Sequence, residues 1–284
     1  MPDPDPTPTE QLRVEVGPFV LDAVATGPPD GPKVVLLHGF PQDSWCWRGV
    51  WPGLAAAGYR VVVPDLRGYS PGARPAGIEP YRMTHLVGDV LAVAGPEPVH
   101  LVGHDWGAAI AWQLAARHPD RLRTLTALSV PHPLAFVEAL QTDPDQQARS
   151  QYMRDWSDPG TEQRLLDEGL RSTFAPVPEV DTDHYLARLS QPGAMTAALN
   201  YYRAQSRADL EGIGAVRVPT LHVWSDDDPA LGRAATLATR RFVEGPYRLE
   251  VLPGVSHWIP EQAPEQVVRL LLEHVVDGPR PGAP

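Results

Sequence analysis

Short apolar segments alternate with longer segments of helical periodicity over most of the chain. Apolar runs of strand length, each bounded by turn residues, occupy residues 34–37, 61–63, 99–102, 122–130 and 218–224. Helical patterns occupy residues 47–57, 84–94, 108–117 and 264–276. Continuous apolar runs are typical of strands buried on both faces. Their alternation with helices predicts an α/β fold, with a mostly parallel central sheet and helices on both faces. Residues 12–16 and 20–25 predict an antiparallel pair of strands at the start.

The alternation breaks between residues 131 and 214, where the pattern is helical. The clearest helical pieces are residues 145–156 and 161–174. Because a structureless loop of this length is implausible in a compact domain, residues 131–214 predict a helical cap, or lid. The cap is inserted into an α/β core formed by residues 11–130 and 215–277. Residues 1–10 and the tail 278–284 are expected to be disordered, since they have few side chains to bury.

Composition narrows the class of protein. The 284 residues carry a net charge of −11, which argues against nucleic acid as a partner because phosphate binding needs a basic surface. Cys46 is the only cysteine, so an intrachain disulfide and a multi-cysteine metal site are excluded. No apolar stretch approaches the roughly 20 residues of a membrane span, and the acidic, proline-rich start differs from a secretory signal. We expect a soluble, cytoplasmic protein that binds no membrane; its oligomeric state stays open, with a homodimer among the alternatives.

Residues able to do chemistry follow the predicted strands, at the edge where an open parallel sheet binds ligands. In chain order these segments are His38-Gly39-Phe40-Pro41, Asp65-Leu66-Arg67-Gly68-Tyr69, Gly103-His104-Asp105-Trp106-Gly107, Asp226-Asp227-Asp228 and His257-Trp258. Residues 103–107 have the form small-x-nucleophile-x-small of a strained strand-to-helix turn, with Asp105 at its centre. An aspartate that only caps the following helix is the alternative. The order Asp105, Asp228, His257 favours a nucleophile, an acid and a base.

These motifs, together with Asn200-Tyr201-Tyr202-Arg203 in the predicted cap, resemble those of the epoxide hydrolase family of α/β-hydrolases. The resemblance covers residues 12–276. The first three motifs are shared with dehalogenases, and the cap motif is the more discriminating one. The resemblance implies an α/β-hydrolase fold and the conversion of an epoxide and water to a vicinal diol, with no cofactor.

The expected chemistry begins with Asp105, because a carboxylate nucleophile is useful only for attack on an sp³ carbon, where it leaves an alkyl ester. His257 would then activate water to hydrolyse the ester. By resemblance, the backbone amides of Phe40 and Trp106 form the oxyanion hole. Asp228 would orient His257, although the acidic run leaves the register ambiguous and Asp226 could instead cap the next helix.

An epoxide oxygen stays attached to the substrate and needs a proton, so a general acid must face the nucleophile. By resemblance, Tyr202 and Tyr152 supply it from the cap. Tyr201 is the alternative to Tyr202, because adjacent helix positions point about 100° apart. The competing interpretation is that these tyrosines only pack the cap helices.

The pocket is expected to be apolar and to bind a small apolar epoxide. Its expected lining residues are Phe40, Trp106, Met153, Trp156 and Trp258. No pair of histidines stands at a metal-ligand spacing in a predicted helix, so no metal site is expected.

Haloalkane dehalogenases share the aspartate nucleophile and are the main alternative, in which Trp156 could supply an indole donor for the halide. They often have an asparagine where this chain has Phe40. Fluoroacetate dehalogenases have an arginine in place of Trp106. A serine esterase is poorly supported because Asp105 stands where serine would, and a non-catalytic binding protein is disfavoured by the complete set of residues.

Overall fold

The computed structural model describes residues 8–174 and 177–275. These residues form an eight-stranded sheet in the order β1-β2-β4-β3-β5-β6-β7-β8. The strands are β1 (Thr9–Val16), β2 (Phe19–Thr26), β3 (Lys33–Leu37), β4 (Arg60–Pro64), β5 (Val99–His104), β6 (Leu122–Leu128), β7 (Thr220–Ser225) and β8 (Tyr247–Leu252). β2 pairs antiparallel with both β1 and β4, and every other pair in the sheet is parallel. The predicted α/β fold and the predicted antiparallel pair at the start are confirmed.

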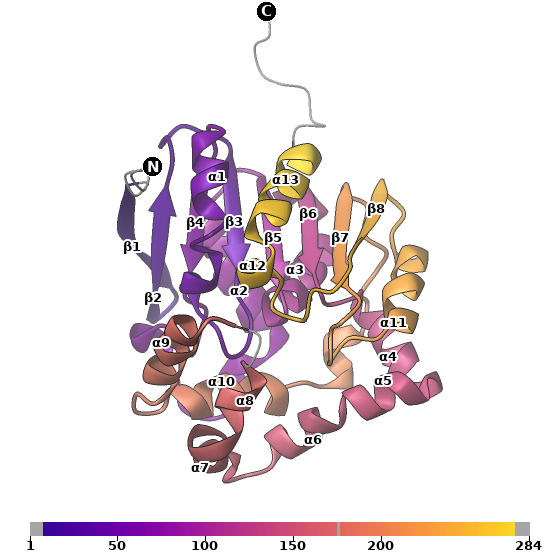
Figure 1. The fold of residues 1–284 in the computed structure, drawn as a ribbon. Helices are drawn as coiled ribbons and strands as arrows, with labels where there is room; N and C mark the ends of the chain where they lie inside the picture. The colour runs from indigo at the N-terminus through magenta and orange to yellow at the C-terminus, as the bar shows by residue number, and fades with distance from the viewer. Residues whose placement is uncertain (1–7, 175–176, 276–284) are drawn as a thin grey trace, which may run out of the picture.

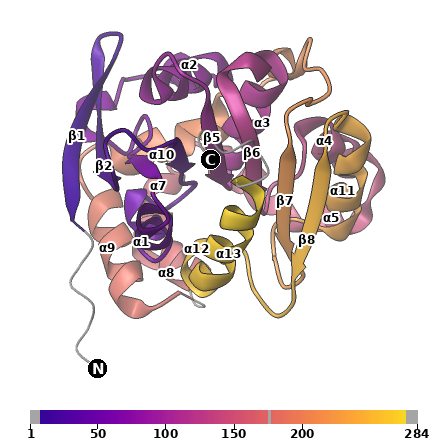
Figure 2. The ribbon, with the colours of Figure 1, turned by 90° about the horizontal axis from the view of Figure 1, so that it is seen from above.

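Helices cover both faces of the sheet, which is why the central strands are apolar throughout. All six residues of β5 are buried, as are all but the first residue of β3 and of β4. Figure 2 shows α2 and α3 on one face and α1 and α13 on the other. The helices that pack around the core are α1 (Trp51–Ala56), α2 (Met83–Ala94), α3 (Trp106–Arg117), α11 (Arg233–Ala238), α12 (Ile259–Gln262) and α13 (Pro264–Val275).

Between β6 and β7 the described residues form helices and connecting turns. Figure 1 shows these helices gathered at one end of the sheet, away from the end where the chain terminates. Since the parallel strands run toward this end, the helices lie over the loops that follow β3, β5 and β7. They are α4 (Pro133–Thr142), α5 (Pro144–Arg149), α6 (Gln151–Ser157), α7 (Thr161–Arg164), α8 (Leu170–Thr173), α9 (Glu179–Leu189) and α10 (Ala194–Arg203).

Several predicted boundaries differ from the structure. The helix expected over residues 47–57 is a 3-10 turn, η1 (Ser44–Trp47), followed by α1, because Pro52 fits only the first turn of a helix. The strand expected over residues 122–130 ends at Leu128, before Ser129, whose φ is 66°. β1 begins at Thr9, within the end that was expected to be disordered. Residues 1–7 and the predicted tail 278–284 lie outside the described residues.

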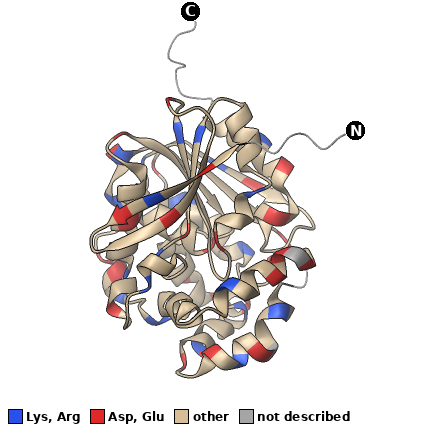
Figure 3. Ribbon diagram, turned by 90° about the vertical axis from the view of Figure 1, so that its left-hand side faces the viewer, with Lys and Arg blue, Asp and Glu red and all other residues tan. Residues whose placement is uncertain are grey.

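Charged residues lie mostly on the helices and outer strands, with few on the central strands (Figure 3). Among the described residues, no helix has the length and apolar character needed to cross a bilayer.

Candidate active site

Asp105 lies in the turn between β5 and α3 with a φ of 51°, a conformation that L-residues other than glycine rarely adopt. The glycines on either side allow this turn to be tight. A Cβ at Gly103 would lie 2.3 Å from the carbonyl oxygen of Gly107, and a Cβ at Gly107 would lie 2.4 Å from that of Leu37. The predicted small-x-nucleophile-x-small pattern therefore has a steric cause, and the strain at Asp105 is of the kind found at functional sites.

The Asp105 carboxylate is held by backbone amides of two elements. The amide of Phe40 donates to Oδ1 at 2.7 Å, and the amide of Trp106 also stabilises the charge. A Cβ at Gly39 would lie 2.3 Å from Oδ1, so the loop after β3 approaches this closely only with glycine there. Oδ2 lies 3.5 Å from Nε2 of His257. The side chain thus binds the neighbouring loop and, within the described residues, forms no cap to α3.

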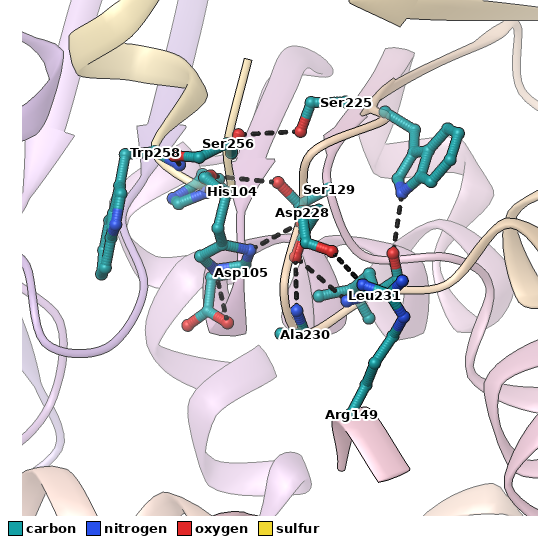
Figure 4. A network of polar contacts seen from close by, with 12 residues as sticks. His104, Asp105, Ser129, Arg149, Ser225, Asp228, Ala230, Leu231, Ser256 and Trp258 are labelled. Atoms are coloured by element: carbon teal, nitrogen blue, oxygen red, sulfur yellow. Dashed lines mark hydrogen bonds and ion pairs between the residues drawn. The ribbon is translucent and has the colours of Figure 1, made fainter. Parts of the chain in front are cut away.

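His257 lies between two carboxylates. Its Nδ1 lies 2.8 Å from Oδ2 of Asp228, opposite the contact with Asp105. Asp228 is buried, and its Oδ1 accepts from the amides of Ala230 at 2.8 Å and Leu231 at 3.0 Å (Figure 4). Three hydrogen bonds therefore fix this carboxylate, with the imidazole on one oxygen and two amides on the other.

The aspartates that follow β7 make different contacts. Asp226 accepts from the amide of Gly254 at 2.7 Å and so ties two loops together, without reaching the imidazole. Of the two register alternatives, Asp228 is the one whose side chain contacts His257. Arg149 of α5 donates to the backbone carbonyl of Asp228 at 2.5 Å, which links this turn to the inserted helices (Figure 4).

The two carboxylates change the charge of the imidazole. Burial alone would lower the pKa of His257, but Asp228 and Asp105 outweigh it and raise the pKa to about 10. Burial would likewise raise the pKa of Asp105, yet the hydrogen bond and charge of His257 and the Trp106 amide hold it below its ordinary value. At neutral pH the site therefore holds an ionised Asp105 beside a protonated His257.

Two tyrosines from the inserted helices face this carboxylate. Tyr152 of α6 and Tyr202 of α10 have ring centroids 6.3 Å apart, and both line the same cavity as Asp105. Burial, and then the negative charge of Asp105, raise the pKa of both phenols well above the ordinary value. Both hydroxyls therefore stay protonated at neutral pH, as a general acid requires.

Tyr201 points elsewhere, since its hydroxyl donates to the backbone carbonyl of Arg67 at 2.7 Å. Of the two adjacent tyrosines, Tyr202 is thus the one at the cavity, and its ring packs edge-on against Trp106 with centroids 5.0 Å apart.

The cavity has a volume of about 440 Å³ and a mostly apolar lining. Trp106 and Met153 line it as expected. Phe40, Trp156 and Trp258 are not among the described residues that line it. Phe40 and Trp156 pack against each other at 4.9 Å and stand against the ring of Tyr202, at 5.4 and 5.3 Å. Trp258 instead packs on Phe174 at 4.8 Å and donates its indole N–H to the carbonyl of Thr173 at 3.1 Å.

The sequence reasoning missed one wall of the cavity. Phe136, Val137 and Leu140 of α4 line it, and so do residues of the 3-10 helix η6 (Arg207–Leu210), such as Leu210. Their i, i+1 and i+4 spacing in α4 marks an apolar helix face, but a sequence gives no sign of what such a face covers. The sequence also carried no indication of the buried pair of His104 and Gln42 behind His257, whose side chains are in contact at 2.9 Å.

Metal-ligand geometry is absent from the part of the chain that the structure describes, where no three His, Cys, Asp or Glu side chains could hold a metal ion. Nε2 of His38 instead accepts a hydrogen bond from the backbone amide of Leu66 at 3.0 Å, which joins the loops after β3 and β4.

Comparison with known proteins agrees with this architecture. The sequence profile of the α/β-hydrolase fold family matches residues 32–264. Epoxide hydrolase A of Mycobacterium tuberculosis is 32% identical over 94% of this chain and 97% of its own length. The AB hydrolase superfamily protein YfhM of Bacillus subtilis is 34% identical over 90% of this chain and 94% of its own length. The crystal structure of epoxide hydrolase A from Mycobacterium thermoresistibile superimposes with a TM-score of 0.83 and 28% identity, covering 95% of this chain and 99% of that one.

A sheet of this topology, with a polar site at the carboxyl ends of its parallel strands, defines an α/β-hydrolase. The chain belongs to the epoxide hydrolase family within that fold.

Proposed function

We propose that this protein is an epoxide hydrolase, which converts an apolar epoxide and water to a vicinal diol through a covalent ester on Asp105. The observation that carries the proposal is a single cavity lined by Asp105, Tyr152 and Tyr202. An ionised nucleophile and two neutral acids then face the same apolar space. Ring opening needs the nucleophile and an acid at the same time, because the leaving oxygen remains on the substrate and must receive a proton.

In the first step Oδ2 of Asp105 bonds to a ring carbon while the carbon–oxygen bond of the epoxide breaks. The epoxide oxygen takes a proton from a tyrosine hydroxyl. Oδ1 stays on the amide of Phe40, and the amide of Trp106 also donates to this carboxyl group, so both donors are in place before the tetrahedral oxyanion forms. Such preorganised donors contribute roughly 2.7–4 kcal/mol each where they have been removed in other enzymes.

Ester formation also prepares the second step. It neutralises Asp105, which removes one of the two charges that raise the pKa of His257. The imidazole then gives its proton back to the tyrosinate and becomes a general base. It takes a proton from water, whose oxygen attacks Cγ of Asp105, and the tetrahedral oxyanion at Oδ1 is stabilised by the same amides. Collapse breaks the bond between Cγ and the ester oxygen, and that oxygen takes the proton from His257 to complete the diol. The Asp105 carboxyl, which keeps the second hydrogen of the water, then passes it to the imidazole and restores the ionised Asp105 and protonated His257. Asp228 orients His257 throughout.

In this proposal residues 131–214 act as the cap, and residues 11–130 and 215–277 as the core. Both acids come from cap helices and the nucleophile from the core, so the reaction takes place between the two. The wall formed by α4 extends the cavity away from Asp105, which suits an alkyl or aryl substituent on the epoxide.

The dehalogenase alternative uses the same nucleophile but has no use for two acids aimed at it. Trp156, its candidate halide donor, packs on Tyr152 at 4.5 Å and on Phe40, and it is not among the described residues that line the cavity.

The test compares diol formation from alkyl and aryl epoxides with halide release from chloro- and bromoalkanes of matched size. We expect the wild type to produce diol without releasing halide, and Asp105→Asn to do neither. Halide release without diol would establish the dehalogenase instead. Asp226→Asn is the matched control, since that carboxylate only joins two loops.

A further inference from the structure

A line of hydrogen-bonded polar side chains runs behind His257 toward α12, from the buried His104 and Gln42 to the half-buried Glu261. Nε2 of His104 lies 2.8 Å from the backbone carbonyl of His257, and Nδ1 lies 2.9 Å from Oε1 of Gln42. The amide group of Gln42 continues to Oε1 of Glu261 at 2.6 Å. The hydroxyl of Tyr185, from α9, donates to the same Glu261 oxygen at 2.9 Å. The other oxygen of Glu261 is buried and has no hydrogen-bond partner among the described residues.

The contacts of His104 restrict where the protons can be. The carbonyl of His257 can only accept, so Nε2 of His104 must carry a hydrogen. A neutral imidazole then has a bare Nδ1, which needs a donor. Gln42 supplies one if its NH₂ group faces His104, and its carbonyl oxygen then faces Glu261. Two oxygens 2.6 Å apart need a hydrogen between them, and only a protonated Glu261 can provide it.

The other arrangement turns the Gln42 amide by about 180°. Its NH₂ group then donates to an ionised Glu261, and its oxygen faces Nδ1 of His104. To donate to both acceptors, His104 would have to be an imidazolium, enclosed and with its ring tilted at 4.9 Å from the ring of His257, which is itself protonated. An ionised Glu261 would also leave one charged oxygen buried without a partner, which is costly.

We infer that Glu261 is a protonated carboxylic acid which, through Gln42, holds His104 as the neutral Nε2–H tautomer against the backbone of the catalytic base. Glu261, Gln42 and His104 are then positioning residues for His257. The inference rests on the proposed function for its catalytic consequence, although the protonation states stand on the hydrogen-bond geometry alone.

The charges around the line favour the same arrangement. Burial raises the pKa of Glu261 to about 7 despite the hydrogen bonds from Gln42, Tyr185 and its own backbone amide, and the charge of Asp181 on α9 adds to this. Burial and the positive charge of His257 lower the pKa of His104 to about 4, against the opposing charges of Asp105 and Asp228. Two other titratable groups lie nearby. The Cys46 thiol is neutral, and the charge of Asp43 acts on both Cys46 and Tyr185.

Loss of the Glu261 proton should break one link of the line. An ionised Glu261 draws the NH₂ group of Gln42, so the Gln42 oxygen turns to Nδ1 of a neutral His104. A neutral His104 has one ring N–H, so it can donate either to the Gln42 oxygen or to the carbonyl of His257, but not to both. The loop that carries the base loses a fixed contact as pH rises through about 7.

The first test is ¹⁵N NMR of the full chain labelled at histidine, between pH 5 and 9. Below pH 7 we expect His104 to show a protonated Nε2 and a hydrogen-bond-accepting Nδ1, with a change centred near pH 7. Glu261→Gln offers an NH₂ donor that cannot ionise, so the change should disappear. Glu265→Gln, at an exposed position of the next helix, should leave it in place. A His104 with both nitrogens protonated below pH 7, or the same midpoint in Glu261→Gln, would overturn the inference.

The second test follows ester hydrolysis in single turnovers. Glu261→Gln should keep the wild-type rate at pH 6 and remove the step near pH 7. Gln42→Leu breaks both links and should slow hydrolysis about 10-fold or more, with little effect on ester formation. A pH profile of Glu261→Gln that matches the wild type would refute the positioning role. If no ester forms at all, the proposed function fails, while the NMR result still decides the protonation states.

Discussion

The ion pair between Asp105 and His257 gives the most direct electrostatic prediction. Asp105→Asn removes a negative charge 3.5 Å from Nε2 of His257 and leaves Asp228 at 2.8 Å on the other side. Coulomb's law gives about 5 kcal/mol for two unit charges at this separation with an effective dielectric constant of about 20. Since one decade in an equilibrium constant is about 1.4 kcal/mol, we expect a large fall in the pKa of His257 from about 10.

The same pair makes stability depend on pH with a definite sign. The pKa of His257 is higher in the folded than in the unfolded protein, so its contribution to stability is fully present below about 6.5. That contribution is lost as pH rises through about 10. The pKa of Asp105 is lower in the folded protein, so its contribution is present at neutral pH and is lost as the carboxyl becomes protonated in acid. Asp105→Asn should flatten both dependences.

The assay is an NMR titration of ¹⁵N-labelled histidine in the wild type, Asp105→Asn and the control Asp226→Asn. The His257 titration should move to lower pH in Asp105→Asn and stay in place in the control. If His257 still titrated near pH 10 without the Asp105 charge, ester formation could not convert it to a base, and the two-step mechanism would fail.

Three further outcomes follow from contacts at the cavity and in the helices between β6 and β7. Tyr202→Phe should slow ester formation about 100-fold in stopped-flow fluorescence. Tyr201→Phe should leave that rate unchanged, because the Tyr201 hydroxyl donates to the backbone carbonyl of Arg67. Equal effects of the two substitutions would contradict the assignment of Tyr202 as the acid. Leu140→Trp should raise KM for aryl epoxides at least 10-fold while sparing the smallest alkyl epoxides, and a uniform loss would argue against the α4 wall. Arg188→Met removes the ion-pair partner that lies 2.6 Å from Asp65, and it should lower the free energy of unfolding by about 3 kcal/mol in denaturant titrations. An unchanged midpoint would show that α9 is held by other contacts.

The strands and the nucleophile turn could be predicted because their causes are local. An apolar run bounded by turn residues reports burial on both faces, and two glycines two positions either side of Asp105 report a tight turn. The predicted antiparallel pair at the start was also correct, since Thr9–Val16 and Phe19–Thr26 are joined by a short turn. Predicted helix boundaries were wrong by a few residues where a single residue restricts the backbone, as Pro52 does in the first turn of α1.

The α4 wall of the cavity could not be predicted, because it depends on contacts between segments far apart in sequence. Trp258 follows His257 in sequence, yet its ring packs on Phe174, and it is not among the described residues that line the cavity. Phe136 and Leu140 carry no motif and become wall residues only because α4 covers the end of the sheet. Glu261 likewise has no sequence signal, since its protonation follows from Gln42, 219 residues away.

The covalent ester on Asp105 is the central claim, and intact mass spectrometry of His257→Gln tests it most directly. This variant should form the ester and stall before hydrolysis. After incubation with an epoxide, we expect an added mass equal to the whole epoxide, located on the Asp105 peptide and missing in the double variant with Asp105→Asn. An adduct formed only from haloalkanes, lighter by the hydrogen halide, or no adduct from any epoxide that the wild type converts to diol, would contradict the account.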